Sequence, residues 1–496
     1  MKKILFALLM ALTISLLLVS CGVQGEKGDK GETGAKGDTG EQGEKGETGK
    51  GVDRFEIVDG ELIIYYTDGT SQNLGKIEGE TEGTDGLEYY PLDDGTYVVS
   101  GGTTTFLEKI EIPKYYKGKA VTQIKNRAFQ NAKNLKEITI PDSVTSIGDE
   151  AFQNCTGLTS IEIPSSVTSI GGAAFLYCSS LTNVTIPDSV TSIGSSAFSG
   201  CTGLTSVTIP DSVTSIGSFA FSGCTGLTSV TIPDSVTSIG ESAFYNCSSL
   251  TYNEYDNAYY LGNDDNPYVV LIKAKDESIT SCTINENTKV IYEEAFKDCA
   301  SLTSVTIGDN VTSIGDETFR NCTGLTNVTI PDSVTSIGYA AFDDCLSLTY
   351  NEYDNAYYLG NDNNPYVVLM KAKDTSITSC TINENTKFIH SEAFRGCTSL
   401  TSVAIGDSVT SIGYGAFLGC TGLTSITIGD SVTSIGSDAF RGCTSLTIYC
   451  EATSEPSGWY SNWNSSSRPV YWYSEEEPTR SGNYWHYVDG VVTVWE

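Results

Sequence analysis

Cysteine is the residue type in this 496-residue chain that could take part in the most kinds of chemistry, and 15 cysteines occur. Thiols can form disulfides, bind metal ions or act as nucleophiles. No Cys-x-x-Cys pair occurs, so zinc sites and thioredoxin-type chemistry are unsupported. Most of the cysteines instead stand three residues after a phenylalanine, at Cys155, Cys178, Cys201, Cys224, Cys247, Cys299, Cys322, Cys345, Cys397, Cys420 and Cys443.

Other residues that catalyse reactions are scarce or unpatterned. Only two histidines occur, His390 and His486, which nearly excludes His-based metal sites and Ser-His-Asp triads. The sequence contains no Gly-x-Ser-x-Gly, His-Glu-x-x-His or P-loop motif. No pair of acidic residues stands out from the repeated background as an acid/base couple. We therefore predict a protein that is not an enzyme and that needs no cofactor and no metal ion.

The charge balance restricts the partners. Lys and Arg number 29 against 62 Asp and Glu, which gives a net charge of −33. Nucleic acid and anionic lipid head groups would be repelled by such a chain, so we expect no nucleic-acid partner.

The phenylalanines reveal an internal repeat. They recur every 23 residues, except for two jumps of 52 residues, each of which is one repeat and 29 residues more. Two near-identical insertions therefore create a 98-residue super-repeat from Thr251 to Thr349. Such self-similarity predicts a solenoid of twelve Phe-marked repeats. These phenylalanines are Phe129, Phe152, Phe175, Phe198, Phe221, Phe244, Phe296, Phe319, Phe342, Phe394, Phe417 and Phe440.

A single repeat shows why the units must stack. Leu204 to Ile209 predicts a short parallel strand whose alternate residues face inward. Pro210 ends the pairing, and Val213 and Ile216 point a second side inward. Gly217 permits a tight bend, after which the Ala-Phe-x-x-Cys segment returns the chain, by our expectation through a short helical turn. One repeat cannot bury these apolar groups alone, so we predict a mostly β solenoid.

Stacking places the eleven repeated cysteines in one column. Cys282 and Cys380 instead occupy the position of a core valine such as Val207. Equivalent residues in neighbouring repeats have parallel Cβ vectors, which is poor geometry for a disulfide. We therefore favour buried thiols, acting as small hydrophobic side chains, over disulfides.

The amino-terminal residues carry targeting signals. Lys2-Lys3 and the apolar run Ile4 to Val19 predict a signal peptide over residues 1–20. The Leu-Val-Ser-Cys tetrapeptide that ends at Cys21 resembles the bacterial lipobox, which implies a lipid attached to Cys21 and an anchor in a membrane. Glycine then falls at every third position from Gly22 to Gly49, the collagen signature. Residues 21–51 therefore form either a flexible stalk or a trimeric rod, which leaves monomer and homotrimer open.

The remaining boundaries follow from composition. Residues 52–86 predict a small β-module with strands at Phe55–Val58 and Glu61–Tyr66, followed by a linker. The repeats fill residues 87–449, with hairpin insertions near 251–279 and 349–377. Residues 450–496 form a Trp- and Tyr-rich cap and tail.

The repeat motif itself resembles a known family. Leu-Thr-Ser-Val-Thr-Ile-Pro-Asp-Ser-Val-Thr-Ser-Ile-Gly followed by Ala-Phe-x-x-Cys is similar to the BspA-like branch of bacterial leucine-rich-repeat surface proteins, from about Tyr97 to Trp472. The resemblance implies a leucine-rich-repeat stack with β-hairpin insertions at Asn257–Lys273 and Asn355–Lys371. Family members are secreted or surface-exposed and are implicated in adhesion to host matrix proteins, in co-aggregation and in biofilms.

Threonine recurs between the two inward residues of the predicted strands. Alternation places these side chains on the exposed sheet face, where they could form a polar platform for an extended partner. The alternative is that threonine is simply a soluble residue that favours strands. The candidate binding residues are Thr185, Thr208, Thr231, Thr306 and Thr329.

The insertions and the tail concentrate aromatic residues. Tyr259 and Tyr260, with their copies Tyr357 and Tyr358, either contact proteins or sugars or pack internally and shield the edge of the solenoid. All five tryptophans lie in the tail, where Trp459 and Trp463 are typical of a cap on the open apolar end, with a carbohydrate-stacking site as the alternative.

These patterns predict a lipid-anchored protein of the bacterial cell surface. It would bind extracellular protein, on the host matrix or on neighbouring bacteria, through the sheet face and the Tyr-rich hairpins. The alternative function is a carbohydrate-binding or envelope-structural lipoprotein.

Overall fold

The computed structural model describes residues 51–58, 61–76, 83–478 and 482–495. The predicted signal peptide, Cys21 and the Gly-X-Y run up to residue 50 lie outside the described residues. Every regular element within these ranges is a β-strand. Accordingly, no helix in the described part of the chain has the length and apolar character needed to cross a membrane.

The residues of the predicted β-module form three strands. β1 (Val52–Val58), β2 (Glu61–Tyr66) and β3 (Ser71–Lys76) form a three-stranded sheet in the order β1-β2-β3. The turn into β3 contains Gly69, whose φ of 81° favours glycine.

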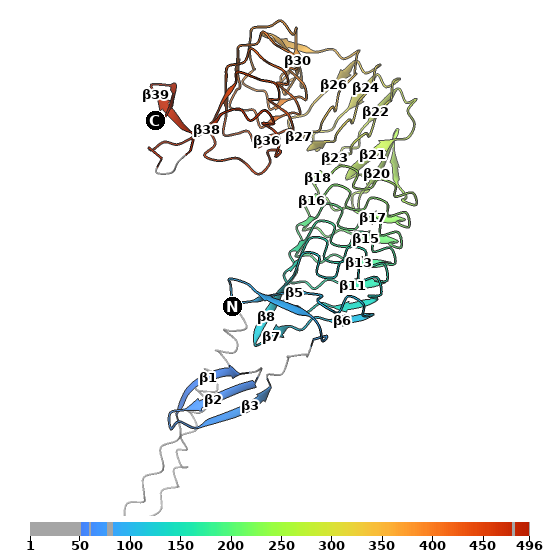
Figure 1. Ribbon diagram of the computed structural model, residues 1–496. Coiled ribbons are helices and arrows are strands. Elements are labelled where there is room, and N and C mark those ends of the chain that lie inside the picture. Colours follow the sequence, from blue (N-terminus) through green and yellow to red (C-terminus); the bar gives the residue numbers. More distant parts are fainter. Residues whose placement is uncertain (1–50, 59–60, 77–82, 479–481, 496) are drawn as a thin grey trace, which may run out of the picture. The chain divides into compact units, whose positions relative to one another are not determined.

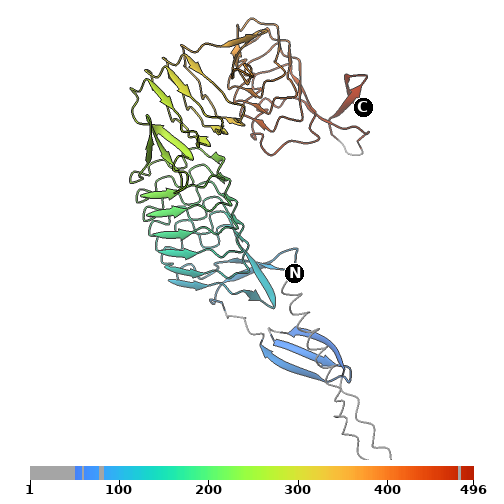
Figure 2. The same cartoon turned by 180° about the vertical axis from the view of Figure 1, so that it is seen from behind.

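The rest of the described chain is a β-solenoid of about 16 turns, each of about 23 residues (Figures 1 and 2). It exceeds the twelve Phe-marked repeats because the insertions and both ends add turns that lack the phenylalanine. β4 (Glu88–Pro91) and β5 (Tyr97–Ser100) pair antiparallel at its start, and β7 (Tyr115–Tyr116) pairs with β8 (Lys119–Ile124). Each regular turn then contributes two short strands, one on each of two sides.

The first set of strands has an apolar residue between two outward polar ones, and we call its outer surface the Thr face. In register, Ser206 lies beside Ser229 and Thr208 beside Thr231. Residues at the same position of successive repeats thus lie in one column. The strands are β6 (Lys109–Glu111), β9 (Glu137–Thr139), β11 (Ser160–Glu162), β13 (Asn183–Thr185), β15 (Ser206–Thr208), β17 (Ser229–Thr231), β22 (Ser281–Thr283), β24 (Ser304–Thr306), β26 (Asn327–Val328), β31 (Ser379–Thr381), β33 (Ser402–Ala404), β35 (Ser425–Ile428) and β37 (Thr447–Cys450).

The second set of strands is shorter and lies on another side of each turn. Most of these strands are Ser-Ile pairs that align in parallel, as Ser192 does with Ser215. They are β8 (Lys119–Ile124), β10 (Ser146–Ile147), β12 (Ser169–Ile170), β14 (Ser192–Ile193), β16 (Ser215–Ile216), β18 (Ser238–Ile239), β23 (Val290–Ile291), β25 (Ser313–Ile314), β27 (Ser336–Ile337), β32 (Phe388–Ile389), β34 (Ser411–Ile412) and β36 (Ser434–Ile435).

Each insertion forms a three-stranded antiparallel unit that starts a new sheet. The first hairpin comprises β19 (Asn253–Tyr255), β20 (Ala258–Leu261) and β21 (Val270–Ala274). The second comprises β28 (Asn351–Tyr353), β29 (Ala356–Leu359) and β30 (Val368–Ala372). Their last strands pair in parallel with the second set, β21 with β23 and β30 with β32. The hairpins are therefore part of the stack and do not hang from it.

The third side of each solenoid repeat consists of short, hydrogen-bonded reverse turns and, within the described residues, contains no helix. The expectation of a short helical turn is therefore wrong. The amide of Phe221 donates to Ala243 O in the next turn, at 2.8 Å, instead of to its own segment. The residue before the cysteine is left-handed, with φ of 72° at Gly223 and 60° at Asn154. That conformation ends any helix after one turn and explains why glycine, asparagine or aspartate usually stands there.

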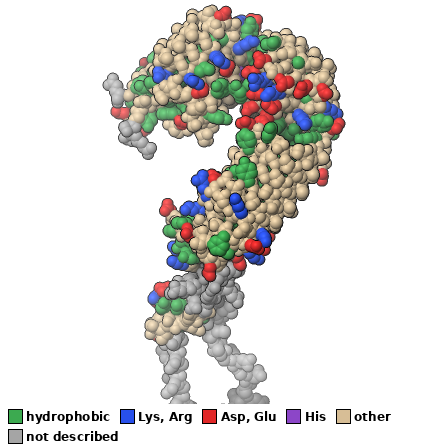
Figure 3. All heavy atoms as spheres, turned by 45° about the vertical axis from the view of Figure 1, so that its right-hand side comes forward, with side chains coloured by type: hydrophobic (Ala, Val, Ile, Leu, Met, Phe, Trp, Pro, Cys, Tyr) green, Lys and Arg blue, Asp and Glu red, His purple; other side chains and the backbone are tan. Residues whose placement is uncertain are grey.

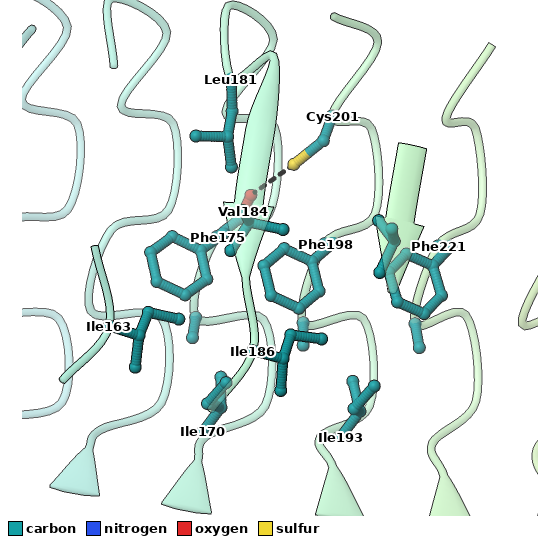
Figure 4. Close-up of a cluster of buried hydrophobic side chains, with 14 of the residues drawn as sticks. Ile163, Ile170, Phe175, Leu181, Val184, Ile186, Ile193, Phe198, Cys201 and Phe221 are labelled. Atoms are coloured by element: carbon teal, nitrogen blue, oxygen red, sulfur yellow. Dashed lines mark hydrogen bonds between the residues drawn. The ribbon is translucent and has the colours of Figure 1, made fainter. Parts of the chain in front are cut away.

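The core is a ladder of phenylalanine rings (Figure 4). The ring of Phe198 stacks on Phe175 at 5.2 Å and on Phe221 at 5.5 Å, with interplanar angles of 5° and 7°. The insertions interrupt the ladder, because Phe244 next meets the tilted ring of Tyr292 at 6.4 Å and Phe342 meets His390 at 6.3 Å. Stacked apolar columns thus hold neighbouring turns together, as a solenoid requires.

The preference for thiols over disulfides is confirmed, since all fourteen cysteines of the described chain are free and buried. The Cys201 thiol donates a hydrogen bond to Phe175 O at 3.2 Å, which is drawn in Figure 4. Equivalent bonds recur along the column, as from Cys224 to Phe198 O. Cys282 pairs with Val305 and so occupies the predicted core-valine column.

The carboxyl-terminal tryptophans close the stack. β38 (Val470–Tyr473) pairs in parallel with β37, and β39 (Tyr484–Val488) and β40 (Val491–Val494) follow. The Trp463 ring packs edge-on against Phe440, the last ring of the ladder, at 5.9 Å. The indole of Trp459 donates to Val432 O at 3.0 Å. These contacts support the capping interpretation of the tail.

Candidate functional site

The Thr face carries the predicted column of threonines. Thr185, Thr208, Thr306 and Thr329 are exposed and Thr231 is half-buried. The apolar residue beside each threonine is buried, as Val207 is between Ser206 and Thr208. The expectation that strand alternation exposes this column is therefore confirmed.

Charge is missing from most of this face. Between residues 163 and 240 the only charged residues are three aspartates, each directly after a proline. In the first set of strands, the outward positions from β13 to β35 carry serine, threonine, asparagine or alanine, whereas β9 and β11 still carry Glu137 and Glu162. Figure 3 shows the result as a broad tan area between groups of charged side chains. In a chain of net charge −33, the Thr face offers a long neutral wall of hydroxyl groups.

The hairpin tyrosines divide into two kinds. Tyr259 and Tyr357 lie half-buried, so part of each ring is accessible. Tyr260 and Tyr358 have no exposed surface, so their prediction as contact residues is wrong. They face inward because a strand alternates its sides, and their rings pack on Tyr268 and Tyr366 at 5.4 and 5.5 Å.

A groove of about 410 Å³ lies where the Thr face meets the first hairpin, and we call it the first hairpin groove. β17 supplies Ser229 and Thr231 to its wall, the start of the insertion supplies Thr251 to Asn253, and the hairpin tip supplies Leu261 to Asp264. Of the predicted residues, the structure thus brings Thr231 together with the hairpin. It adds Tyr252, an insertion tyrosine that is not among the predicted binding residues.

Backbone bonds hold the tip against the stack. The amide of Ile232 donates to Gly262 O at 2.9 Å, and the Asn263 side-chain amide donates to Ile232 O at 3.0 Å. The Asn263 Oδ1 atom accepts from the amides of Asp265 and Asn266, which makes the tip a tight turn. The groove is therefore built on fixed backbone.

A second groove, of about 510 Å³, lies beside Tyr259 and Lys273. The Lys273 ammonium lies 5.3 Å from the centre of the Tyr252 ring and 5.8 Å from that of Tyr259, which are cation–π distances. The two rings are 5.8 Å apart. Tyr252 therefore stands between the two grooves, and its partial burial raises its pKa.

Replacing Gly262 by alanine is expected to open the first hairpin groove. An alanine Cβ would lie 2.1 Å from Asn266 O, far inside contact distance, and the tip would have to move away. Overpacking of this kind costs about 1–3 kcal/mol, here in local stability. Hydrogen exchange at the Ile232 amide measures the loss. Gly308→Ala is the control, because its nearest neighbour is 3.7 Å away; equal protection in both variants would contradict the prediction.

The tail tryptophans do not form an accessible sugar platform. Trp459 and Trp463 are 5% and 4% exposed, and their rings pack against each other at 4.9 Å. Their prediction as candidate binding residues is therefore wrong, because Trp463 packs on Phe440 and Trp459 packs on Trp463 and Trp472.

His390 and the buried cysteines have the properties of core residues. Burial lowers the pKa of His390 to about 4, which keeps the ring neutral. Burial raises the pKa of the Cys155 and Cys224 thiols to about 12, which keeps them protonated and unreactive. Within the described ranges, no group of three or more histidine, cysteine, aspartate or glutamate side chains is placed to hold a metal ion.

Comparison with known proteins decides the family. The sequence matches the BspA-type leucine-rich repeat region over residues 103–209, 170–263, 274–362 and 372–454, more than half of the chain. The chain is a BspA-type leucine-rich repeat protein. Solenoids of this leucine-rich repeat family are typically non-catalytic binding scaffolds.

Solved leucine-rich repeat structures are similar to this one. A leucine-rich cell surface protein from Faecalibacterium prausnitzii is 30% identical, with 78% of this chain and 98% of that chain covered and a TM-score of 0.33. A leucine-rich repeat protein from Bacteroides ovatus is 28% identical over the same shares, with a TM-score of 0.36. The pneumococcal vaccine antigen PcpA is 19% identical, with 79% and 98% covered and a TM-score of 0.31. No curated protein matches the sequence.

Proposed function

We propose that this BspA-type leucine-rich repeat protein is lipid-anchored at the bacterial cell surface and binds an extracellular protein partner. The neutral Thr face carries the proposal. It presents hydroxyl groups in register over consecutive turns, and it adjoins the half-exposed rings of the hairpins. A solenoid offers such an extended surface to partners, and tyrosine is a favoured contact residue at interfaces.

The anchor and the partner class rest on separate supports. The lipobox-like Cys21 supports attachment to a membrane, and the Gly-X-Y run supports either a flexible spacer or a homotrimeric rod between membrane and solenoid. The 30% identical relative from Faecalibacterium prausnitzii is described as a cell surface protein, which supports the location. Host matrix or a neighbouring bacterial surface would supply the partner.

Charged substitutions on the Thr face test the proposal. Thr185→Lys combined with Thr208→Lys places two ammonium groups in the neutral wall, and both native side chains are exposed, so the fold should tolerate them. We expect saturable binding of the purified protein to at least one member of a panel of extracellular-matrix and bacterial surface proteins, and at least a tenfold loss in this variant, a change of about 1.4 kcal/mol.

The control uses the same change on another side of the stack. Thr191 and Thr214 are exposed residues that precede β14 and β16, so Thr191→Lys combined with Thr214→Lys adds the same charge away from the Thr face. Equal losses in both variants would reject the Thr face as the binding surface. Absence of binding to every protein in the panel would reject the protein-binding function.

The alternative of carbohydrate binding by the tail loses its support, because Trp459 and Trp463 are buried.

A further inference from the structure

The super-repeat repeats the residues that line the first hairpin groove. Its wall residues recur 98 positions later with one difference, Asn327 in place of Ser229. The bonds that shape the tip recur as well: Ile330 N donates to Gly360 O at 3.0 Å, and the Asn361 amide donates to Ile330 O at 2.9 Å. Both tips also need glycine, since a Cβ on Gly360 would lie 2.1 Å from Asn364 O. The chain therefore carries the same wall twice, on the same kind of fixed backbone.

The wall of the groove has the chemistry that recognises a sugar. Tyr252 supplies an aromatic ring, suited to the apolar C–H face of a pyranose. Ser229 and Thr231 supply hydroxyl groups that donate and accept, and the exposed Asp264 supplies a carboxylate that accepts from neighbouring sugar hydroxyls. The Asn253 side-chain amide donates to Pro267 O at 3.0 Å, and its side-chain oxygen is a further acceptor. A concave site with one aromatic surface and a few placed polar groups is typical of small-ligand binding.

The lining disfavours an anion, a calcium ion and a purely apolar ligand. Asp264 carries the only carboxylate among the lining residues, and no lysine, arginine or histidine is among them. The Lys273 ammonium lies 5.3 Å from the centre of the Tyr252 ring, in a cation–π contact. The lining therefore disfavours an anion. The wall contains a single carboxylate, too few for a calcium site that takes six to eight oxygen ligands. Its polar lining equally disfavours a purely apolar ligand.

We propose that each hairpin groove binds one neutral sugar unit, with Tyr252 and Asp264 as the main contacts in the first and Tyr350 and Asp362 in the second. One chain then carries two equivalent glycan sites. Linking two weak sites raises the apparent affinity for a multivalent glycan by about 10²–10⁴-fold without any new contact. This inference goes beyond protein binding by the Thr face and does not depend on it.

Saturation-transfer NMR on the purified full chain, with cellobiose, maltose, lactose and N,N′-diacetylchitobiose as probes, tests the sites. We expect transfer to the ring protons of at least one disaccharide. Combined Asp264→Ala and Asp362→Ala should abolish it, and so should combined Tyr252→Ala and Tyr350→Ala. The aspartates are exposed at turns, so the first pair reports on binding even if loss of the tyrosines disturbs packing. No transfer from any probe, or transfer unchanged in the aspartate pair, would overturn the proposal.

A surface coated with the bound disaccharide tests bivalence. Asp264→Ala alone should weaken binding to the surface by at least about tenfold while leaving free-disaccharide transfer detectable, because the second groove is intact. A single variant that binds the surface like the native chain would overturn the claim of two equivalent sites. Matrix-protein binding that is lost in the aspartate pair without any sugar signal would assign the grooves to protein contact and reject the sugar.

Discussion

Replacing Phe221 by alanine is expected to destabilise the solenoid by about 3–5 kcal/mol. The ring has no exposed surface and stacks between Phe198 at 5.5 Å and Phe244 at 5.6 Å. Its loss leaves a cavity that two neighbouring rings border, and the stacked turns cannot close it without breaking the register of both strand sets. Chemical denaturation followed by circular dichroism measures the loss.

The same segment supplies a matched control. Phe219 lies two residues earlier in the same turn and is 40% exposed. Phe219→Ala removes the same number of atoms but should cost about 1 kcal/mol or less, since this ring is not in the ladder. Comparable costs for the two variants would show that the ladder is not the main source of stability.

The effect of Phe221→Ala should also be local. In a solenoid each turn contacts only its neighbours, so stability is about a sum of turn and interface contributions. Hydrogen exchange should therefore accelerate most in the turns of Phe198, Phe221 and Phe244. Acceleration that is uniform along the chain would instead indicate a single cooperative unit.

The fold was predictable because the period is strict. When every turn has the same length, residues at equal repeat positions form columns, and the columns of phenylalanine, cysteine and threonine follow from counting alone. The left-handed residue before each cysteine was also readable, since glycine, asparagine or aspartate stands there in most turns. Our expectation of a helical turn did not take these residues into account.

The site was less predictable, because it depends on contacts between turns. In the pair Tyr259-Tyr260, only one ring can face outward, and alternation alone does not say which. The structure shows a shift of register between them, opposite β21, that buries Tyr260. To predict the groove, one would have to know that Gly262 O accepts from the amide of Ile232, the residue directly after β17. This contact spans 30 residues of sequence, and the repeat period does not predict it.

Raising the pH above 9 is expected to unfold the protein steeply. Burial raises the pKa of Cys155, Cys224 and Cys345 to about 12, against an ordinary value of 9.0. Because the folded-state pKa lies above the unfolded one, the stabilisation is fully present below pH 9 and is lost as the pH rises toward 12. Each such thiol removes up to about 1.4 kcal/mol per pH unit in that window.

The losses of stability from the individual thiols should add. Most of the fourteen buried thiols lie in one stack, so the free energy of unfolding should fall several times faster with pH than it would for one group. Buried tyrosines such as Tyr260 and Tyr292 have pKa values raised by burial too, so the thiol contribution must be isolated. A variant of the cysteines provides that separation.

The chain shows which variant the column tolerates, because Ala132 already occupies the cysteine position after Phe129 and is fully buried. Combined Cys178→Ala, Cys201→Ala and Cys224→Ala should lower stability at pH 7, where the thiols pack as small hydrophobic groups. The same variant should lose less stability than the native chain between pH 9 and 11, since three ionisations are gone. Denaturant titrations at both pH values measure the difference. Parallel losses in the two proteins would show that tyrosine ionisation, and not the thiol column, sets the alkaline limit.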